Sequence, residues 1–416
     1  MMAFYHTQEG VEPHIRQEKL WQRLHEQVDY VRQHSRFYQT LYKDVDPNLS
    51  GRALQEALPL LHKSALPAQQ SQDAPFGNIN SVPLEKFVRL FASPGPIYEG
   101  AMNGDYWRLA QALFAASIEQ NDIIQNCFSY HFTPAGMMVE GGAQALGIPV
   151  IPAGVGNSDL QVQVMAHYGA SSYCGTPDFL KIILEKADAM QIALPKLKKG
   201  MVSGGPFFPA LRDDYQQRGL VVTQCLAAAD VGLMAFEIVH EGKVIDDGQV
   251  VAEDIILELI DPNSGCSIEN PDEIGEIVVT RFCNQFPLIR YATGDLSMWH
   301  KEKSPCGRTN QRIKGWMGRV DMTTKIKGMF VHPSQIEKAL ADYQDALHAF
   351  SLQVNEQGGH DEAILHIVTK QAGDEKNLQS QLEISLQAHC RLKIKVKKVD
   401  SLPDDAKIIE DKRQLS

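Results

Sequence analysis

The chain has 416 residues, of which 44% are hydrophobic and 22% are charged. This length exceeds what one ordinary core holds, so two or three folding units are expected in a soluble globular protein. The formal net charge of -11 argues against a nucleic-acid partner, because no basic face is available to release counterions from phosphates.

The N-terminal residues have neither the basic stretch nor the apolar stretch of a secretion signal, and no apolar run reaches the length of a membrane span. The seven cysteines are scattered, and none forms a CxxC pair. This spacing predicts neither a disulfide framework nor a paired-cysteine zinc site. Together these features predict a cytoplasmic protein without a membrane partner.

Residues 14–43 place apolar side chains three to four positions apart, which predicts an amphipathic helix. From residue 103 to about 235, helical segments alternate with short apolar segments such as 148–151 and 199–203. This alternation predicts a mainly parallel sheet with helices on its faces. Ligands of such sheets bind at the carboxyl ends of the strands.

Beyond residue 240 the pattern changes to strands, with segments 255–260 and 275–281 separated by a turn at 261–265. The last hundred residues alternate strands and helices, beginning with a helix start in which Ser334 and Glu337 are spaced as a capping box. We therefore expect an α/β protein with a large domain over residues 1–316, including a β-rich part. A small α+β domain follows over residues 317–416.

The motif with the most chemistry is Tyr-Ala-Thr-Gly-Asp-Leu at 291–296, followed by Gly-Arg-Val-Asp at 318–321. A carboxylate at Asp295 can accept both hydroxyls of a ribose, and the guanidinium of Arg319 can fork to two phosphate oxygens. The alternatives are an ordinary turn for Asp295 and a solvated hairpin for Arg319. The ordered combination favours a nucleotide site at a domain joint.

The sequence resembles the adenylate-forming acid ligases, specifically the phenylacetate–CoA ligase branch, over roughly residues 14–413. The resemblance rests on short segments in the expected order: Ala-Pro-Phe-Gly at 74–77, Cys-Gly-Thr-Pro at 174–177, Ser-Gly-Gly-Pro at 203–206, Pro-Leu-Ile-Arg-Tyr at 287–291, and Val-His-Pro-Ser-Gln-Ile-Glu at 331–337. Members of this family join a carboxylic acid to ATP, release pyrophosphate and pass the acyl group to CoA.

The resemblance implies a role for each matching residue. Asp295 and Arg319 are the implied ribose and phosphate contacts, Asp230 the Mg²⁺ ligand, Lys407 the catalytic lysine and Asp321 the hinge between the domains. The remaining nucleotide-binding residues are Ser93, Gly95, Gly204, Gly205, Pro206, Leu226 and Ala227. The implied acid pocket contains Tyr130, His131, Phe132 and Ala228.

Several positions depart from the family pattern. In the phosphate loop at 92–100, two prolines remove N–H donors, and Glu99 stands near the expected lysine. Leu226 replaces the aromatic residue that stacks on adenine. The zinc cysteines are reduced to Cys306, which predicts no zinc, and the lysine loop near Lys407 is shortened.

We therefore expect a ligase that uses ATP, Mg²⁺ and CoA on an aromatic or other hydrophobic carboxylic acid, with another thiol or an amine as an alternative acceptor. The family analogy favours a homodimer. A second hypothesis is a divergent homologue with weak or no adenylation activity that binds AMP or an acyl-adenylate. A third is a condensing enzyme that accepts preformed adenylates.

Overall fold

The computed structural model describes residues 4–93, 96–262, 264–320, 324–326, 329–331, 333–357, 360–370, 375–390, 392–403 and 406–412. The chain forms two units, Met1–Trp316 and Met317–Ser416. In the described ranges, no helix is long and apolar enough to cross a membrane. Each unit has a core of its own, and each is described separately below.

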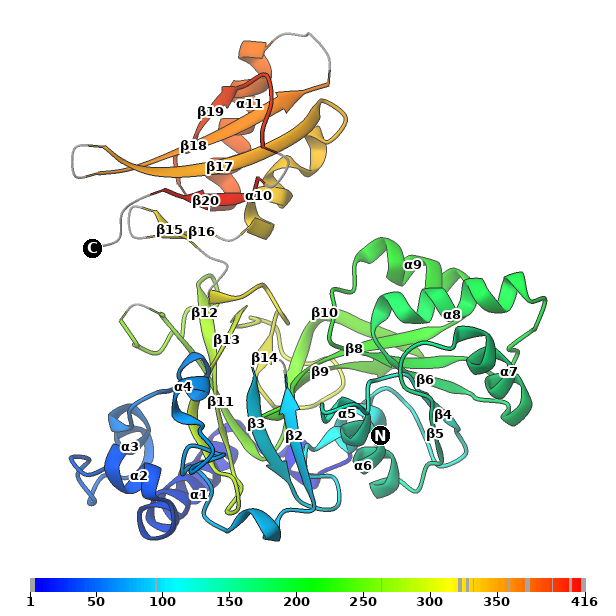
Figure 1. Cartoon of the computed structure of the whole chain (residues 1–416), viewed down its shortest axis with the longest axis vertical. Coiled ribbons are helices and arrows are strands. Elements are labelled where there is room, and N and C mark those ends of the chain that lie inside the picture. Colours follow the sequence, from blue (N-terminus) through cyan, green and yellow to red (C-terminus); the bar gives the residue numbers. More distant parts are fainter. Residues whose placement is uncertain are drawn as a thin grey trace. The chain divides into compact units, whose positions relative to one another are not determined.

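An eight-stranded sheet with the order β14-β10-β9-β8-β7-β6-β4-β5 organises the first unit (Figure 1). Strands β5, β4, β6, β7 and β8 run parallel, and β9, β10 and β14 continue the sheet in antiparallel pairs. The strand bounds are β4 Ile124–Asn126, β5 Val150–Pro152, β6 Ser172–Gly175, β7 Lys199–Val202, β8 Val221–Ala228, β9 Gly232–His240, β10 Lys243–Val251 and β14 Arg312–Ile313. The predicted parallel sheet is confirmed.

Helices cover both faces of the parallel part of this sheet. Buried residues of α7, α8 and α9 share one apolar cluster, whereas those of α5 and α6 belong to another. The bounds are α5 Leu109–Ala115, α6 Ala135–Ala145, α7 Ser158–Tyr168, α8 Pro177–Ala189 and α9 Pro209–Gln217. The Asp105 carboxylate stabilises the start of α5, because it accepts hydrogen bonds from the N–H groups of Leu109 (2.7 Å) and Ala110 (2.9 Å).

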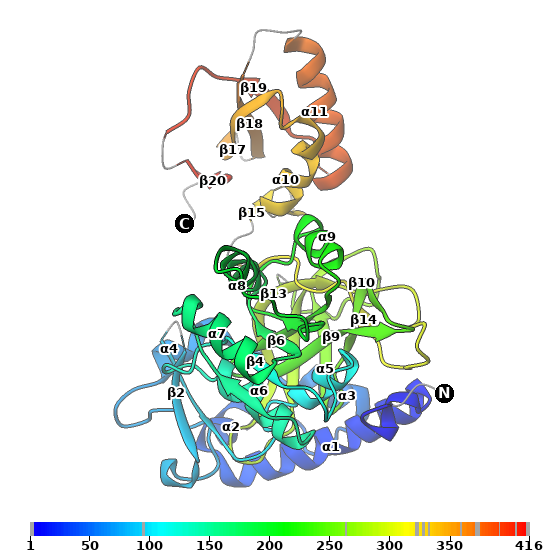
Figure 2. The same ribbon diagram turned by 90° about the vertical axis from the view of Figure 1, so that its right-hand side faces the viewer.

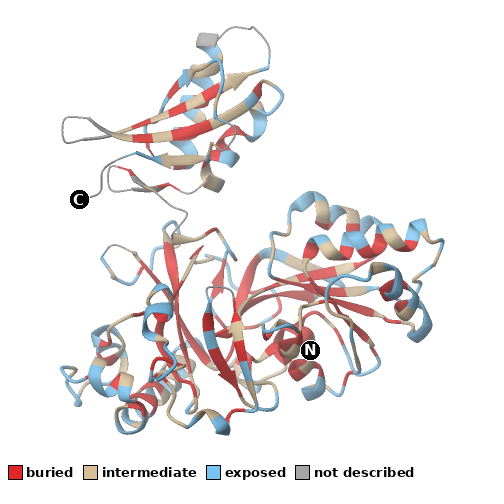
Figure 3. Ribbon diagram, in the orientation of Figure 1, coloured by how far each residue is buried: buried red, intermediate tan, exposed pale blue. Residues whose placement is uncertain are grey.

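A second sheet of the first unit has the order β1-β13-β12-β11 and carries the Thr-Gly-Asp motif. Its strands are β1 Leu61–His62, β11 Ile255–Ile260, β12 Ile274–Arg281 and β13 Leu288–Met298. All six residues of β11 are buried, as are seven of the eight in β12. Figure 3 shows the same concentration of buried residues along these central strands.

The N-terminal part of the first unit consists of the long helix α1, several short helices and the β2–β3 pair. Its elements are η1 Thr7–Gly10, α1 Pro13–His34, α2 Arg36–Leu41, α3 Gly51–Ala57, η2 Lys63–Ala65, α4 Leu66–Gln69, η3 Leu84–Lys86, β2 Arg89–Ser93 and β3 Ile97–Ala101. The long helix α1 runs along the base of the unit (Figure 2). Its Leu24, Val28 and Val31 are buried, as the predicted amphipathic pattern requires.

The second unit has a four-stranded sheet with the order β19-β18-β17-β20 and a separate β15–β16 pair. Leu382, Leu386 and Cys390 of α11 belong to the apolar core of this unit. The bounds are β15 Thr324–Ile326, β16 Met329–Val331, α10 Pro333–Leu340, η5 Ala341–Tyr343, β17 Leu347–Gln357, β18 His360–Thr369, α11 Glu375–Cys390, β19 Lys395–Lys398 and β20 Ile409–Asp411. The α+β prediction for this part of the chain is confirmed.

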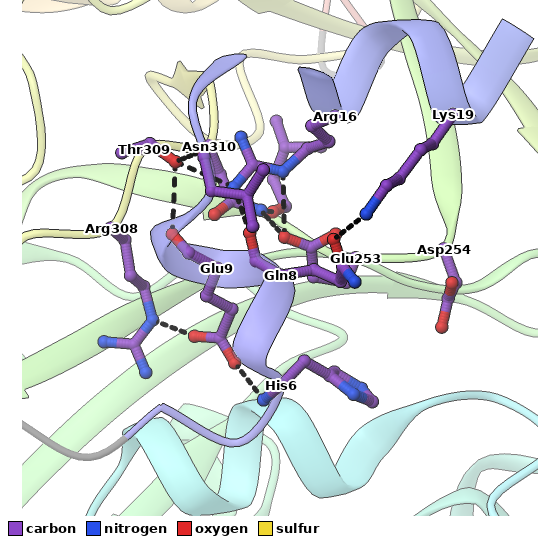
Figure 4. A network of polar contacts seen from close by, with 12 residues as sticks. His6, Gln8, Glu9, Arg16, Lys19, Glu253, Asp254, Arg308, Thr309 and Asn310 are labelled. Carbon is purple, nitrogen blue, oxygen red and sulfur yellow. Dashed lines mark hydrogen bonds and ion pairs between the residues drawn. The ribbon is translucent and has the colours of Figure 1, made fainter. Parts of the chain in front are cut away.

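A polar network attaches the N-terminus to the segment before β14 (Figure 4). The Arg308 guanidinium pairs with the Glu9 carboxylate, and their side chains are 1% and 2% exposed. The Thr309 N–H donates to the Glu9 carbonyl at 2.9 Å, and Arg16 donates to the Thr309 hydroxyl at 2.8 Å. Because a buried charge is costly without its partner, this pair holds both segments in place.

The Glu9–Arg308 pair predicts a large stability effect. Replacing Glu9 with Ala leaves a buried guanidinium unpaired, so we expect the free energy of unfolding to fall by about 3–5 kcal/mol. Urea denaturation monitored by tryptophan fluorescence measures this change. The exposed Glu18→Ala variant on α1 serves as the control and should change stability by less than about 0.5 kcal/mol. Equal losses in both variants would contradict this role for the pair.

Candidate functional site

Asp295 lies inside strand β13, at a bulge rather than in a turn between elements. The register with β12 shifts between Glu276 and Val278, and Gly294 has a φ of 81°, which favours glycine. The Thr293 hydroxyl accepts the Asp295 N–H at 3.1 Å, while the Trp316 indole N–H donates to Asp295 Oδ1 at 3.1 Å. The bulge therefore directs a partly exposed carboxylate away from the regular ladder.

Asp230 lies in the tight turn between β8 and β9, and side chains from elsewhere anchor the carbonyl groups of this turn. Trp107 donates to the Ala229 carbonyl at 3.0 Å, and Arg281 donates to the Asp230 carbonyl at 2.7 Å. At Gly232 a Cβ atom would lie 2.8 Å from the Trp107 carbonyl oxygen, so the close approach of these segments requires glycine. The turn is thus held rigidly from two sides.

The Asp230 carboxylate is buried, with 3% exposure, and compensated by several donors. Lys63 Nζ lies 2.9 Å from Asp230 Oδ2, the Tyr291 hydroxyl donates to the same oxygen, and the Val231 N–H donates to Oδ1 at 2.9 Å. Burial raises the pKa of Asp230, but the Lys63 charge and the hydrogen bonds outweigh burial and lower this pKa below its usual value. Asp230 is therefore an ionised group in a preformed ion pair.

Glu99 places a second buried carboxyl group beside this pair. It lies on β3 with 3% exposure, and its Oε1 atom has no hydrogen-bond partner. Burial and the nearby Asp230 charge raise the pKa of Glu99 to about 8. A pKa of about 8 favours the protonated form of the Glu99 carboxyl group at neutral pH.

The predicted phosphate loop is a short hairpin between β2 and β3, which pair from Arg89–Ala101 to Ser93–Ile97. The buried Ser93 hydroxyl donates to the Ile97 carbonyl at 3.3 Å, and the Tyr98 N–H donates to the Gln70 side chain at 2.8 Å. Gly95 lies outside the described residues. At residues 93 and 96–100, the backbone pairs as two antiparallel strands, the Tyr98 N–H is already bonded and Pro96 has no N–H. These described residues therefore form no cluster of N–H groups that point at one phosphate.

The residues predicted to bind adenine gather at the carboxyl edge of the parallel sheet. Gly204 has a φ of 72°, and a Cβ atom there would lie 3.9 Å from both Phe128 and Thr176. Loops that follow β4, β6 and β7 thus meet at one place. The Ser203 hydroxyl donates to the Cys225 carbonyl at 2.9 Å, which ties the loop of Gly204, Gly205 and Pro206 to β8. Leu226, Ala227 and Ala228 on β8 are partly buried.

The three predicted acid-pocket residues on the loop after β4 have different environments. The Tyr130 hydroxyl accepts from Asn126 at 2.7 Å and donates to Glu140 at 3.0 Å. A Cβ atom at Gly136 would lie 2.8 Å from the Tyr130 ring, so this ring packs directly on the helix backbone. His131 is exposed, and Phe132 is 79% exposed. Among the described contacts of these three residues, only the Tyr130 side chain forms hydrogen bonds.

The predicted residues of the second unit have less defined surroundings. Arg319 is partly buried, and Asp321 lies outside the described residues. Lys407 is exposed in an irregular segment before β20, where its carbonyl accepts from Ser351 at 2.7 Å. Their roles around a nucleotide stay predictions.

The segment around Cys306 is held by the N-terminal network. Cys306 Sγ lies 3.0 Å from the Ser304 hydroxyl and 3.2 Å from Arg308 Nη1. Glu237 on β9 pairs with Arg212 at 2.8 Å. Within the described ranges, no group of three or more His, Cys, Asp or Glu side chains could hold a metal ion.

The sequence did not single out Lys63 and Tyr291, the two side chains that contact the Asp230 carboxylate. Lys63 follows the two-residue strand β1, and no local pattern distinguishes it from a surface lysine. Tyr291 belongs to the motif already recognised, but its hydroxyl partner lies 61 residues earlier in the chain. The parallel pairing of β1 with β13 brings His62 opposite Ala292 and thereby carries Lys63 to the motif.

Comparison with known proteins places this geometry in a recognised group. Residues 328–413 match the AMP-binding enzyme C-terminal domain. A phenylacetate–coenzyme A ligase of Thermus thermophilus is 27% identical over 361 residues, covering 83% of this chain and 80% of the relative. A phenylacetate–coenzyme A ligase of Escherichia coli is 25% identical over 327 residues, covering 75% of this chain and 74% of the relative.

A solved structure of 2-hydroxyisobutyryl-CoA ligase has the same fold. Its open conformation, in complex with 2-HIB-AMP and CoA, superposes on this chain with a TM-score of 0.86. The match covers 97% of this chain and 93% of that one, at 22% sequence identity. The similarity confirms the α/β architecture with a separate C-terminal α/β unit.

The buried Glu99 carboxyl predicts a pH-dependent stability difference. Its pKa is raised from 4.5 to about 8 in the folded protein, so its contribution to stability is full below about pH 4.5 and is lost as the pH rises toward 8. Relative to the wild type, Glu99→Gln should gain up to about 1.4 kcal/mol of stability per pH unit across this window. Urea denaturation from pH 4 to pH 9 tests this; a pH-independent difference would contradict it.

Proposed function

Because the chain belongs to the phenylacetate–CoA ligase-like branch of the adenylate-forming enzymes, we propose that it is an acid–CoA ligase that activates an aromatic or other hydrophobic carboxylic acid. The acid would react with ATP to form an acyl-adenylate and pyrophosphate, and the acyl group would then pass to the thiol of CoA. We further propose that the protein works in the cytoplasm as a homodimer.

One observation carries this proposal: Asp295 and the Lys63–Asp230 pair share one electrostatic neighbourhood. Burial lowers the pKa of Lys63, but the charges of Asp230 and, to a smaller extent, Asp295 outweigh burial and raise it. Burial raises the pKa of Tyr291, and the charges of Asp230 and Asp295 raise it further. A carboxylate that can accept ribose hydroxyls therefore lies near an ammonium that can attract phosphate. These two groups suit a nucleotide, because its ribose hydroxyls can donate to the carboxylate and its negative phosphates can pair with the ammonium.

The surroundings of Asp230 do not fit a Mg²⁺ ligand as they stand. Oδ2 accepts from both Lys63 and Tyr291, and a cation there would lie against the Lys63 ammonium. Mg²⁺ is commonly bound through substrate phosphates and waters with one or two protein carboxylates. We therefore propose that Mg²⁺ arrives with ATP, and that Lys63 supplies the fixed positive charge beside Asp230.

The residues predicted in the second unit keep their roles in this proposal. Arg319 would contact the ribose and the α-phosphate, Lys407 would stabilise the charge that develops during adenylation, and Asp321 would act as the hinge. Of these three residues, Lys407 lies within residues 328–413, and the match of that range to the AMP-binding enzyme C-terminal domain supports its proposed role.

The acid would bind near Tyr130 and the small residues at the end of β8. Tyr130 is fixed by Asn126 and Glu140, so its ring offers a rigid apolar wall. Ala227, Ala228 and Ala229 leave space beside it. The names of the curated relatives, which are phenylacetate–coenzyme A ligases, support an aromatic acid.

A second candidate function is a homologue that binds AMP or an acyl-adenylate with little adenylation activity. The β2–β3 hairpin favours it, because the Tyr98 N–H is engaged by Gln70 and Pro96 has no N–H to offer a pyrophosphate. Such a protein would keep the ribose contact of Asp295 and lack a strong grip on the β- and γ-phosphates.

The Asp295→Ala variant tests the nucleotide site. Removal of the carboxylate should weaken AMP binding at least tenfold, because a charged hydrogen bond to a neutral partner contributes about 1.5–3 kcal/mol. Calorimetric titration with AMP measures this, and Asp73→Ala, at an exposed position, is the control. Unchanged AMP affinity would exclude Asp295 from the site, whichever of the two functions is correct.

The Lys63→Met variant tests the role of Lys63 in adenylation, and the wild-type protein separates the two candidate functions. If Lys63 assists adenylation, the variant should lose at least tenfold in ATP–pyrophosphate exchange with phenylacetate and related acids while AMP binding is kept. Lys86→Met, which alters an exposed lysine of η3, should retain full exchange. Wild-type protein that binds AMP but exchanges no pyrophosphate with any acid of an aromatic and aliphatic panel would favour the second function instead.

A further inference from the structure

A cavity of about 580 Å³ lies between helix α1 and the segment that follows β12. Gln27 and Tyr30 line it from α1, Tyr106 lies before α5, and Arg281 and Cys283 come from the end of β12 and the residues after it. None of these residues belongs to the sites predicted for the nucleotide, the acid or CoA. Pockets of about 300–1,000 Å³ hold small organic ligands.

The Cys283 thiol lies in this cavity, partly exposed and held in a fixed position. The Cys283 N–H donates to the Gln27 side chain at 3.1 Å, which fixes the backbone. Cys283 Sγ lies 3.7 Å from the Tyr106 hydroxyl and 3.5 Å from Gln285 Oε1. The thiol is thus surrounded by polar groups and remains accessible from the cavity.

The environment of Arg281 independently favours a negatively charged group in this cavity. Its guanidinium is 2% exposed, donates from Nη1 to the Asp230 carbonyl at 2.7 Å, and lies 4.1 Å from the centre of the Tyr106 ring. Its Nη2 atom has no hydrogen-bond partner, although it is buried. A buried cation with unused donors is costly. A thiolate at Cys283 would supply the acceptor and the countercharge that Arg281 lacks.

The ionisation of Cys283 differs from that of the deeply buried cysteines. Burial raises the pKa of the Cys283 thiol, but the Arg281 charge and the surrounding hydrogen bonds outweigh burial and lower this pKa below its usual value. By contrast, burial raises the pKa of Cys127 and Cys225 to about 12 and that of Cys390 to about 11. The thiolate is the nucleophile in disulfide exchange, so Cys283 is favoured over these three.

We propose that Cys283 is a site of reversible modification by a low-molecular-weight peptide disulfide of the glutathione type. The Cys283 thiolate attacks one sulfur of the disulfide, and a new sulfur–sulfur bond joins Cys283 to that half. The original disulfide bond breaks, and the other half leaves as a thiolate that takes a proton from water. Cys283 is oxidised and the released half is reduced, so no further oxidant is needed.

The lining of the cavity suits a peptide. Asn284 and Gln285 contribute carboxamide groups, which match the hydrogen-bonding groups of peptide amides. Tyr30 and Phe282 provide aromatic surfaces. The charged lining residues besides Arg281 are Glu26 and Arg23, of which Arg23 pairs with Asp254 and lies over the Phe282 ring. The cavity therefore offers positive and polar groups around the thiol.

Incubation of the full chain with glutathione disulfide at pH 7 tests the proposal. We expect the mass to increase by one glutathionyl group, located on the Cys283 peptide and removed by dithiothreitol. Cys283→Ser should prevent this modification, and Cys266→Ser, which removes an exposed cysteine elsewhere, should leave it unchanged. No modification, or modification located on Cys266 in preference to Cys283, would overturn the proposal.

The role of Arg281 is tested by the rate of the same reaction. Arg281→Gln should slow modification of Cys283 at pH 7 at least tenfold and shift the inflection of the pH–rate profile to higher pH; an unchanged rate would contradict the role of Arg281. If this variant does not fold, the pH–rate profile of Cys283 modification in the wild-type protein tests the proposal instead. An inflection below the ordinary thiol value of about 8.5 supports the site, and one at or above it overturns the proposal.

Discussion

The buried carboxylate of Asp230 connects distant segments of the first unit. Its side chain binds Lys63 after β1 and Tyr291 on β13, and its carbonyl accepts from Arg281 on β12. An ionised carboxylate at 3% exposure is tolerated only when donors surround it. The arrangement of these strands around the β8–β9 turn is therefore a requirement of this charge as well as of apolar packing.

The same cluster balances the charges of three side chains. Two carboxyl groups, Asp230 and Glu99, lie close to one ammonium, Lys63, and the raised pKa of Glu99 keeps one of them neutral. Asp230 then carries the negative charge and Lys63 the positive charge, and such a neutral pair is tolerated in a buried environment. The segment that the sequence predicts to be the phosphate loop includes residues of the antiparallel β2–β3 pair.

A buried ion pair and hydrogen bonds hold the Cys306 segment. Glu9 and Arg308 join the N-terminus to this segment, and Arg308 also contacts the Cys306 sulfur. The Arg281 guanidinium has a comparable double role, because it supports the Asp230 turn on one side and faces the Cys283 cavity on the other. Charged side chains in this protein thus connect its functional regions as well as its secondary structure.

The sequence by itself determined the order and type of most elements, because apolar periodicity is a local property of helices and strands. It also predicted Asp295 as a site residue, since the Thr-Gly-Asp motif is contiguous. Only the tertiary structure decided that this motif is a bulge within β13, that α5 begins after Asp105, and that Glu99 is buried. It also decided that Lys63, Asp230 and Tyr291 meet. These contacts join residues that lie far apart in the chain, and the pairing of strands creates them, so no local pattern records them.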